Sequence, residues 1–195
     1  MMTTSSASLY QPGSLQGHFL LSMPHLDDPG FAQSLIYICE HNESGAMGIV
    51  INQPTEMDLN ELLQLLEFNH DHVQPGIRIY TGGPVQADRG FILHCHSDNQ
   101  WDSSYPINAQ VSLTTSMDIL QAISENRGPD TFLVALGYAG WGAGQLEHEL
   151  SDNAWLSCPA NLDIMFHTPA QERLQAAAAS MGINLNLLTS QSGHA

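Results

Sequence analysis

The sequence contains no lysine, so its cations are four arginines, against twenty carboxylates in 195 residues. Nucleic-acid binding begins with the neutralisation of phosphates by clustered Lys and Arg side chains. The four arginines are instead scattered along the chain, as Arg78, Arg89, Arg127 and Arg173. The formal charge of −16 therefore disfavours direct nucleic-acid binding, and solubility explains it more simply than an acidic docking surface does.

Cysteine is scarce as well. Cys39, Cys95 and Cys158 lie far apart, their number is odd, and no CxxC pair occurs. This pattern fits free thiols in a reducing compartment better than a disulfide framework. We therefore expect a cytoplasmic protein.

Long apolar runs are missing too. Gly, Pro or a charged residue interrupts every candidate before it reaches the roughly 18 residues that cross a bilayer. The first fifteen residues lack the charged start, apolar run and cleavage site of a secretory signal. The sequence predicts no membrane partner.

Familiar catalytic and cofactor motifs are absent. The chain has no GxSxG elbow and no HExxH helix. It has no CxxC or HxxxH pair at metal-ligand spacing, and no GxGxxG or GxxxxGK[ST] nucleotide loop. We expect no resident metal and no cofactor, and the lack of a catalytic constellation favours a domain that is not an enzyme.

The composition indicates one domain, because 43% apolar residues in a chain of this length can bury one sizeable core. We predict that the domain spans residues 15–188, between flexible tails at residues 1–14 and 189–195.

Apolar runs bounded by turn residues predict strands, and apolar residues at helical spacing predict helices. The expected strands lie at residues 18–24, at 34–53 as a hairpin ended by Pro54, at 77–84 and 90–97 around a turn at 86–90, at 131–137, at 154–159 and at 163–167. Residues 111–128 predict a strand followed by a helix, and further helices are expected at 58–68, 144–150 and 168–181. Because strands and helices do not alternate regularly, we expect a mixed, curved sheet with helices around it, in the α+β class.

The most distinctive segment is GYAGWGAG, from Gly137 to Gly144, between an expected buried strand and an expected helix. Glycines in such a loop permit positive φ and let backbone N–H groups face an anion. Against an anion site, no lysine follows, and Glu147 and Glu149 would repel one. The simpler interpretation is a tight strand-to-helix crossing.

A second constellation is CEHN, from Cys39 to Asn42, at the end of an apolar run. Strand alternation would put Cys39 and His41 on one face and Glu40 on the other. Two residues so spaced lie roughly 6.5 Å apart, too far for a direct hydrogen bond, although both could approach one bound atom. Core packing of Cys39 is the alternative.

Two other groups of residues carry weaker signals. His94 and His96 would share one strand face and could in principle contribute zinc ligands, yet ordinary strand histidines explain them better. Arg89 could clamp a carboxylate, and an ion pair with Asp88 or another carboxylate is the simpler expectation.

Several segments together resemble the AlgH/YqgE family of bacterial proteins, whose biochemical function is unsettled. They are HFLLSMP, DPGFAQSLIYICEHNESGAMGIVINQP, GGPVQADRGFILH, LTTSMDIL, LVALGYAGWGAGQLEHEL and NAWL, in order over residues 15–180. The resemblance implies a mixed, largely antiparallel bifurcated sheet curled into a pseudo-barrel with flanking helices. Some members carry the label of transcriptional regulator, which is not a mechanism.

The resemblance brings no catalytic residues, and basic residues common in the family are absent here near Ala32, Gln33 and Met117. Its frequent motif residues are present at Cys39, Glu40, His41, Asn42, Gly83, Pro84, Arg89, Gly90, Gly137, Gly140, Trp141, Gly142, Gly144 and Gln145. The candidate ligand site takes from this set Cys39, Glu40, His41, Asn42, Arg89, Gly140, Trp141, Gly142, Gly144 and Gln145.

Three functions are open at this point. The leading one is a binding or regulatory domain that acts on a protein or small-molecule partner without contacting DNA. The second is a small-molecule enzyme or anion-binding protein that uses CEHN and the glycine segment. The third is a DNA-binding regulator, which the charge disfavours.

Overall fold

The computed structural model describes residues 13–26 and 28–191. Most of the predicted N-terminal tail, residues 1–12, and the end of the predicted C-terminal tail, residues 192–195, lie outside the described residues. The last helix, α6 (Leu185–Gln191), extends into the segment predicted as a C-terminal tail.

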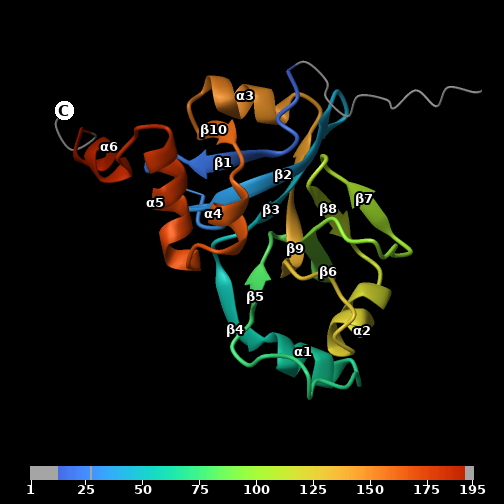
Figure 1. The fold of residues 1–195 in the computed structure, drawn as a ribbon. Coiled ribbons are helices and arrows are strands. Elements are labelled where there is room, and N and C mark those ends of the chain that lie inside the picture. The colour runs from blue at the N-terminus through green and yellow to red at the C-terminus, as the bar shows by residue number, and fades with distance from the viewer. Residues whose placement is uncertain (1–12, 27, 192–195) are drawn as a thin grey trace, which may run out of the picture.

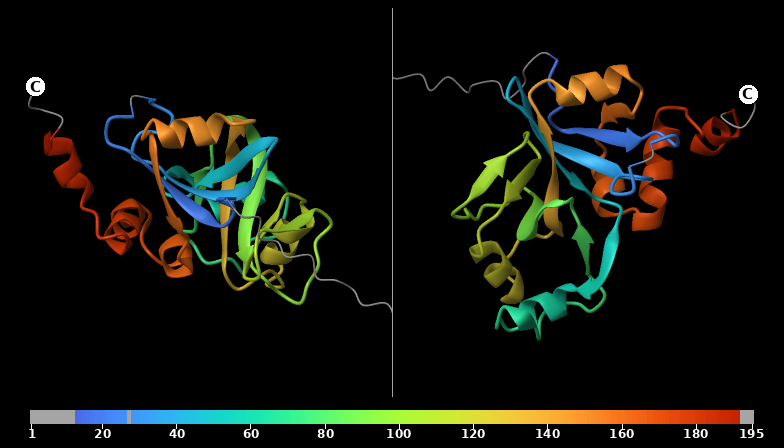
Figure 2. Two further views of the ribbon diagram at one scale, coloured as in Figure 1. Left: turned by 90° about the horizontal axis from the view of Figure 1, so that it is seen from above. Right: turned by 180° about the vertical axis from the view of Figure 1, so that it is seen from behind.

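The centre of the fold is one mixed, largely antiparallel sheet that curls (Figures 1 and 2). Its main path runs through β10 (Trp155–Pro159), β1 (His18–Ser22), β2 (Leu35–Asn42), β3 (Gly45–Val50), β9 (Phe132–Gly142), β6 (Val85–Cys95), β8 (Val111–Thr114) and β7 (Ser104–Pro106). Two strands branch off this path, β4 (Pro54–Asp58) and β5 (Arg78–Thr81).

The sheet divides at the long strand β9. Its first half pairs with β6 and, in parallel, with β5 through Ala135 and Leu136. Its second half pairs with β3 from Ala139 to Gly142. Because β3 and β5 follow one another along β9, the sheet forks there, and this confirms the predicted α+β class with a bifurcated sheet.

Six helices are described around the sheet. In Figure 1, α3 (Gln145–Ser151) crosses one end of the sheet, while α1 (Leu59–Leu65) and α2 (Asp118–Ser124) lie at the opposite end. The third group, α4 (Leu162–Phe166), α5 (Ala170–Ser180) and α6, covers one flank. None of these helices is long and apolar enough to span a bilayer, within the described part of the chain.

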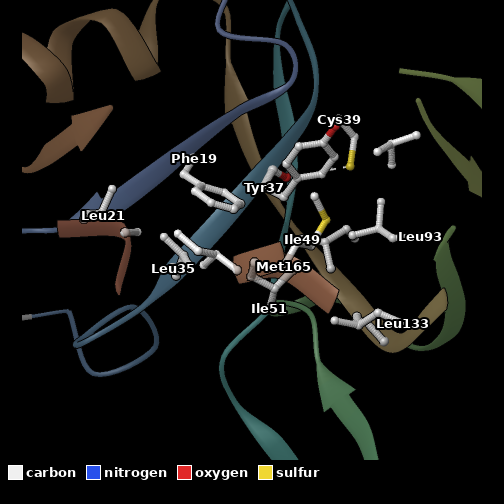
Figure 3. Packing of buried hydrophobic residues seen from close by; sticks show 14 of the residues in the cluster. Phe19, Leu21, Leu35, Tyr37, Cys39, Ile49, Ile51, Leu93, Leu133 and Met165 are labelled. Carbon is white, nitrogen blue, oxygen red and sulfur yellow. Dashed lines mark hydrogen bonds between the residues drawn. The ribbon is translucent and has the colours of Figure 1, made fainter. Parts of the chain in front are cut away.

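The main core lies between the concave sheet and α4 and α5. Figure 3 shows Phe19, Tyr37 and Ile49 from three strands meeting Met165 from α4, and all four side chains are fully buried. A second cluster, under α3, contains Ile36, Ile38, Trp141, Leu146 and Trp155. Residues alternate between the two clusters along β2, which is why that strand reads as a continuous apolar run.

The predicted helix at residues 58–68 is confirmed as α1, together with its capping box between Asp58 and Glu61. The prediction of a strand at residues 163–167 is wrong, because this segment forms α4. The Asn161 side chain accepts hydrogen bonds from the Asp163 and Ile164 N–H groups, which caps the helix. Adjacent Ile164 and Met165 are both buried, as one face of a short helix permits.

Pro54 does not merely end a hairpin, since it begins β4, where a missing N–H is tolerated at the first position of a strand. The expected turn at residues 86–90 lies inside β6, where the register with β9 shifts between Val85 and Gly90. Strand β7 was not predicted, and its three residues are all exposed. Irregular pairing and short exposed strands give no clear sequence pattern.

Candidate functional site

The glycine segment forms part of β9 and is not a loop. The strand continues through Gly142, so only Ala143 and Gly144 separate it from α3. Its backbone pairs with β3, the strand that follows CEHN in the hairpin. The predicted order of strand, glycine loop and helix is therefore wrong in its middle part, because tertiary pairing holds the glycines extended.

This pairing brings CEHN and the glycine segment together. His41 lies opposite Ala46, and Ala46 lies opposite Trp141, so these residues form one row across β2, β3 and β9. The next row contains Asn42, Gly45 and Gly142. Directly paired residues share a face of the sheet.

Cys39 and His41 do not share a face, contrary to the alternation prediction. The register of β2 against β3 shifts between Ile38 and Glu40, which leaves Cys39 as an extra, bulged residue. Cys39 packs in the main core with Tyr37, whereas His41 reaches α3. A single bulge therefore exchanges the faces of all the residues after it.

His41 is 7% exposed, and both of its ring nitrogens are engaged. The backbone N–H of Leu15 donates to Nδ1 over 2.9 Å, so Nδ1 carries no proton. The proton is on Nε2, which donates to the Glu147 Oε1 atom of α3 over 2.6 Å. The imidazole is thus a neutral connector between the N-terminal segment, the sheet and α3.

Glu149, two residues after Glu147 in α3, also accepts hydrogen bonds from the sheet. Its Oε2 atom accepts from the Trp141 Nε1 atom at 2.6 Å and from the Trp155 Nε1 atom at 3.2 Å. The two indoles meet edge to face at 6.0 Å between centroids, and Phe31 stacks on Trp141. Glu149 therefore joins two strands through one carboxylate.

Glu147 and Glu149 were not predicted as site residues, because the sequence suggested only that they would repel an anion. In the structure they accept hydrogen bonds from His41 and Trp141, and so attach α3 to the sheet. The pKa of Glu147 is lowered by its own backbone N–H and by the hydrogen bond from His41. The sequence signal available for these residues was a pair of glutamates two positions apart, shortly after a predicted strand. Such pairs are too common to identify a site.

Cys39 is not an accessible nucleophile. Its side chain is 1% exposed, and burial raises the pKa of its thiol, with the Glu40 charge adding to the effect. Its Sγ atom donates a weak hydrogen bond to the Tyr37 carbonyl at 3.7 Å. The structure thus supports the core-packing interpretation of this residue.

Two glycines of the segment have φ in the left-handed region, Gly137 at 78° and Gly144 at 74°. A Cβ at Gly137 would lie 2.3 Å from the Gly83 carbonyl oxygen, so two backbones approach closely there. Gly140 and Gly142 meet only ordinary contacts. The N–H of Gly142 donates to Oε1 of Gln145, the first residue of α3, rather than to an open anion site.

Residues of both rows also line a shallow depression of about 220 Å³. Glu40, Asn42, Ser44, Met47 and Trp141 contribute to its lining. The Asn42 side chain donates to Glu40 Oε1 at 3.1 Å and accepts from the Ser44 N–H at 2.8 Å. The polar groups of this depression are hydrogen-bonded to one another and remain exposed to solvent.

Arg89 lies on β6 beside the start of the glycine segment, and it lines a different pocket from CEHN. Its guanidinium donates to Gln86 Oε1 and Thr115 Oγ1, each at 3.2 Å, and covers the Phe91 ring. No ion pair with Asp88 is formed within the described residues, so that expectation is wrong. The Gln86 amide oxygen and the Thr115 hydroxyl accept from Arg89 in place of the expected carboxylate.

His94 lies in β6, whereas His96 follows the end of that strand and is exposed. His94 is 2% exposed, with Nδ1 at 2.9 Å from the Cys95 carbonyl and Nε2 at 2.7 Å from Thr114 Oγ1. Burial lowers the pKa of His94. Among the described residues, no group of three or more His, Cys, Asp or Glu side chains could hold a metal ion.

Comparison with known proteins matches residues 19–186 to the AlgH-like family. A UPF0301 protein of Thioalkalivibrio sulfidiphilus is 54% identical over 177 residues, 91% of this chain and 95% of its own. The UPF0301 protein AlgH of Pseudomonas aeruginosa is 53% identical over 188 residues, 94% of this chain and 97% of its own.

Two solved structures share the fold. The solution structure of AlgH from Pseudomonas aeruginosa superimposes with a TM-score of 0.76 at 52% identity, covering 95% of this chain and 98% of its own. A crystal structure of a protein from Corynebacterium diphtheriae has a TM-score of 0.71 at 19% identity, covering 89% of this chain and 91% of its own.

Proposed function

Since this chain belongs to the AlgH-like family, whose biochemical function is unknown, we propose that it is a non-catalytic binding domain that acts on a protein or small-molecule partner without contacting DNA. The single observation that carries the proposal is that the reactive side chains of CEHN are either buried or already hydrogen-bonded within the protein. The His41 ring nitrogens are both engaged and the Cys39 thiol is buried, so neither offers a base or a nucleophile.

The outward residues of the same segments supply the proposed binding surface, which is the depression bordered by Glu40 and Asn42. Its polar side chains are positioned by one another and by the hairpin, and such preorganisation lowers the entropic cost of binding. Trp141 also lines the depression, and its hydrogen bond to Glu149 holds its indole in place.

The cations support the absence of direct DNA contact. Arg173 is buried and Arg127 pairs with Glu125, which leaves Arg78 and Arg89 as the exposed arginines without a carboxylate partner among the described residues. Two such charges cannot outweigh a net charge of −16 near a polyphosphate. The proposal includes a cytoplasmic location, which the free Cys39, Cys95 and Cys158 favour.

The DNA part is tested by titrating a mixed-sequence DNA duplex into the full chain at low and moderate salt in a mobility-shift assay. We expect no shift even at low salt. A saturable complex that weakens steeply as salt rises would overturn this part, because that slope reports phosphate contacts.

The binding part is tested by a ligand screen that follows ¹H–¹⁵N resonances of the full chain. We expect a bound compound to shift the Glu40 and Asn42 amides, with affinity lost in Asn42→Ala and kept in Glu43→Ala, an exposed neighbour. Turnover of any screened compound, abolished by Cys39→Ser or His41→Asn in a folded protein, would contradict a non-catalytic role.

A further inference from the structure

A cavity of about 370 Å³ lies between β5, the start of β9, and the segment that joins α4 to α5. Two of the four arginines of the chain, Arg78 and Arg173, line it. It lies at the end of β9 opposite to the CEHN rows, so it is distinct from the proposed binding surface.

Arg173 is a buried cation without a carboxylate. Its side chain belongs to a residue that is only 5% exposed, and no ion pair of the described residues includes it. The guanidinium instead donates from Nε to the Thr168 carbonyl and from Nη1 to the Ile51 carbonyl, at 2.8 and 2.5 Å. Its carbon lies 5.1 Å from the centroid of the Tyr80 ring.

These contacts hold the guanidinium in place and leave its charge uncompensated. A buried ion is costly unless a counter-ion is near, and carbonyl dipoles and an aromatic face supply only part of that stabilisation. Nη2 has no hydrogen-bond partner among the described residues. Among the described residues, the side-chain atoms that are both buried and unpartnered are Asn60 Oδ1 and Trp101 Nε1. Because Nη2 of Arg173 is not one of them, it is still reached by solvent.

Arg78 adds a second uncompensated charge to the same cavity. Its Nη1 atom donates to the Glu56 carbonyl at 2.7 Å, again to a neutral oxygen rather than to a carboxylate. In a protein with so few cations, two guanidinium groups on one cavity form a local positive site. Planar guanidinium groups suit the two oxygens of a carboxylate.

The rest of the lining restricts the anion. Ile77, Phe132, Leu133 and Phe166 supply apolar surface, which suits a ligand with an apolar body. The exposed carboxylate of Asp130 also lines the cavity and opposes anions of higher charge. We propose that this cavity binds a small organic acid, with one carboxylate held by Arg173 and Arg78 and a ring or short chain against Phe132 and Phe166.

The test titrates the full chain with 3-phenylpropionate and follows ¹H–¹⁵N resonances, including the Nε–H of Arg173. We expect saturable binding with a dissociation constant on the order of 1 mM, given the size of the probe. The uncharged 3-phenylpropanamide and inorganic phosphate should each bind about tenfold or more weakly, because one lacks the charge and the other the apolar body.

Arg78→Met should weaken binding of 3-phenylpropionate about tenfold. Because the Arg78 side chain is exposed, Arg78→Met is expected to fold even if Arg173→Met does not. Arg89→Gln, an arginine outside the cavity, is the matched control and should bind as the parent chain does. Equal binding of the acid and the amide, equal binding of phosphate, no saturation up to about 10 mM, or equal losses in Arg78→Met and Arg89→Gln would each overturn the proposal.

Discussion

Nε2 of His41 lies 2.6 Å from Oε1 of Glu147, a residue 106 positions further along the chain. On the other side of the ring, Nδ1 accepts from the Leu15 N–H. The imidazole therefore links three segments that meet only in the folded protein. Because Nδ1 must stay unprotonated for the Leu15 bond, the geometry defines the tautomer without reference to catalysis.

Glu147→Ala should destabilise the fold by about 1 kcal/mol, because it leaves a buried Nε2–H without its acceptor while the site stays half open to water. Glu147→Gln keeps an acceptor oxygen and should cost about half as much. Urea denaturation of both variants measures the free energy of unfolding. Glu43→Ala, which removes an exposed carboxylate two residues after His41, is the control and should be neutral. Equal losses in Glu147→Ala and Glu147→Gln would argue against this hydrogen bond.

Glu147 also gives a pH dependence. Its pKa is lowered in the folded state by its own backbone N–H and by His41, so folding is favoured most while the carboxylate is ionised. The contribution is present above the ordinary pKa of 4.5 and is lost as pH falls through the lower folded value. The difference in unfolding free energy between the parent chain and Glu147→Gln should therefore shrink below about pH 4.5. A difference that does not change between pH 7 and pH 3 would contradict this assignment.

His94 gives the stability of the fold a pH dependence in a higher range than Glu147 does. Burial lowers its pKa, so the unfolded chain takes up a proton near the ordinary value of 6.5 while the folded chain does not. Stability is therefore fully present above that value and declines as pH falls below it. Denaturation between pH 8 and pH 5 should show a smaller decline in His94→Gln than in the parent chain, whereas the exposed His72→Gln should behave as the parent does. Parallel curves for all three proteins would contradict a buried neutral His94.

The sequence predicted those parts of the fold that local patterns determine. The capping box at Asp58 and Glu61, the β2–β3 hairpin and the apolar run of β9 each have a signal within a few residues. The resemblance to a family supplied the bifurcated sheet, which periodicity alone would not have given. These features need no knowledge of distant partners.

The candidate site depended on contacts that local patterns do not contain. Alternation failed at Cys39, because one bulged residue moved His41 to the other face. The glycine segment was predicted as a loop, because its pairing partner lies about ninety residues earlier in the sequence, at Gly45 to Gly48. Partners at such distances are decided by packing, and packing was not visible in the sequence.

The four glycines of the segment should differ in their tolerance of substitution. Gly137→Ala puts a Cβ at positive φ and 2.3 Å from the Gly83 carbonyl oxygen, and should cost at least about 2 kcal/mol. Gly140→Ala meets Tyr138 Cε2 at 3.4 Å, an ordinary contact, and should change stability by less than about 0.5 kcal/mol. Urea denaturation of the two variants compares them directly. If both substitutions cost the same, the close approach at Gly137 does not explain the glycine.

The three thiols should also react at different rates, and their order tests whether Cys39 can act as a nucleophile. Cys39 is 1% exposed and Cys158 is 8% exposed, and burial raises the pKa of both thiols. Cys95 is partly exposed, and its pKa is also raised, so it should react slowly yet before the others. Because the thiolate is the reactive form, native iodoacetamide labelling followed by peptide mass mapping should detect Cys95 first. Cys39 should become labelled only at the rate at which the protein opens, and urea should abolish the difference. Labelling of Cys39 as fast as Cys95 in the native protein would show that the CEHN thiol is accessible, and would restore the enzymatic alternative that its burial now argues against.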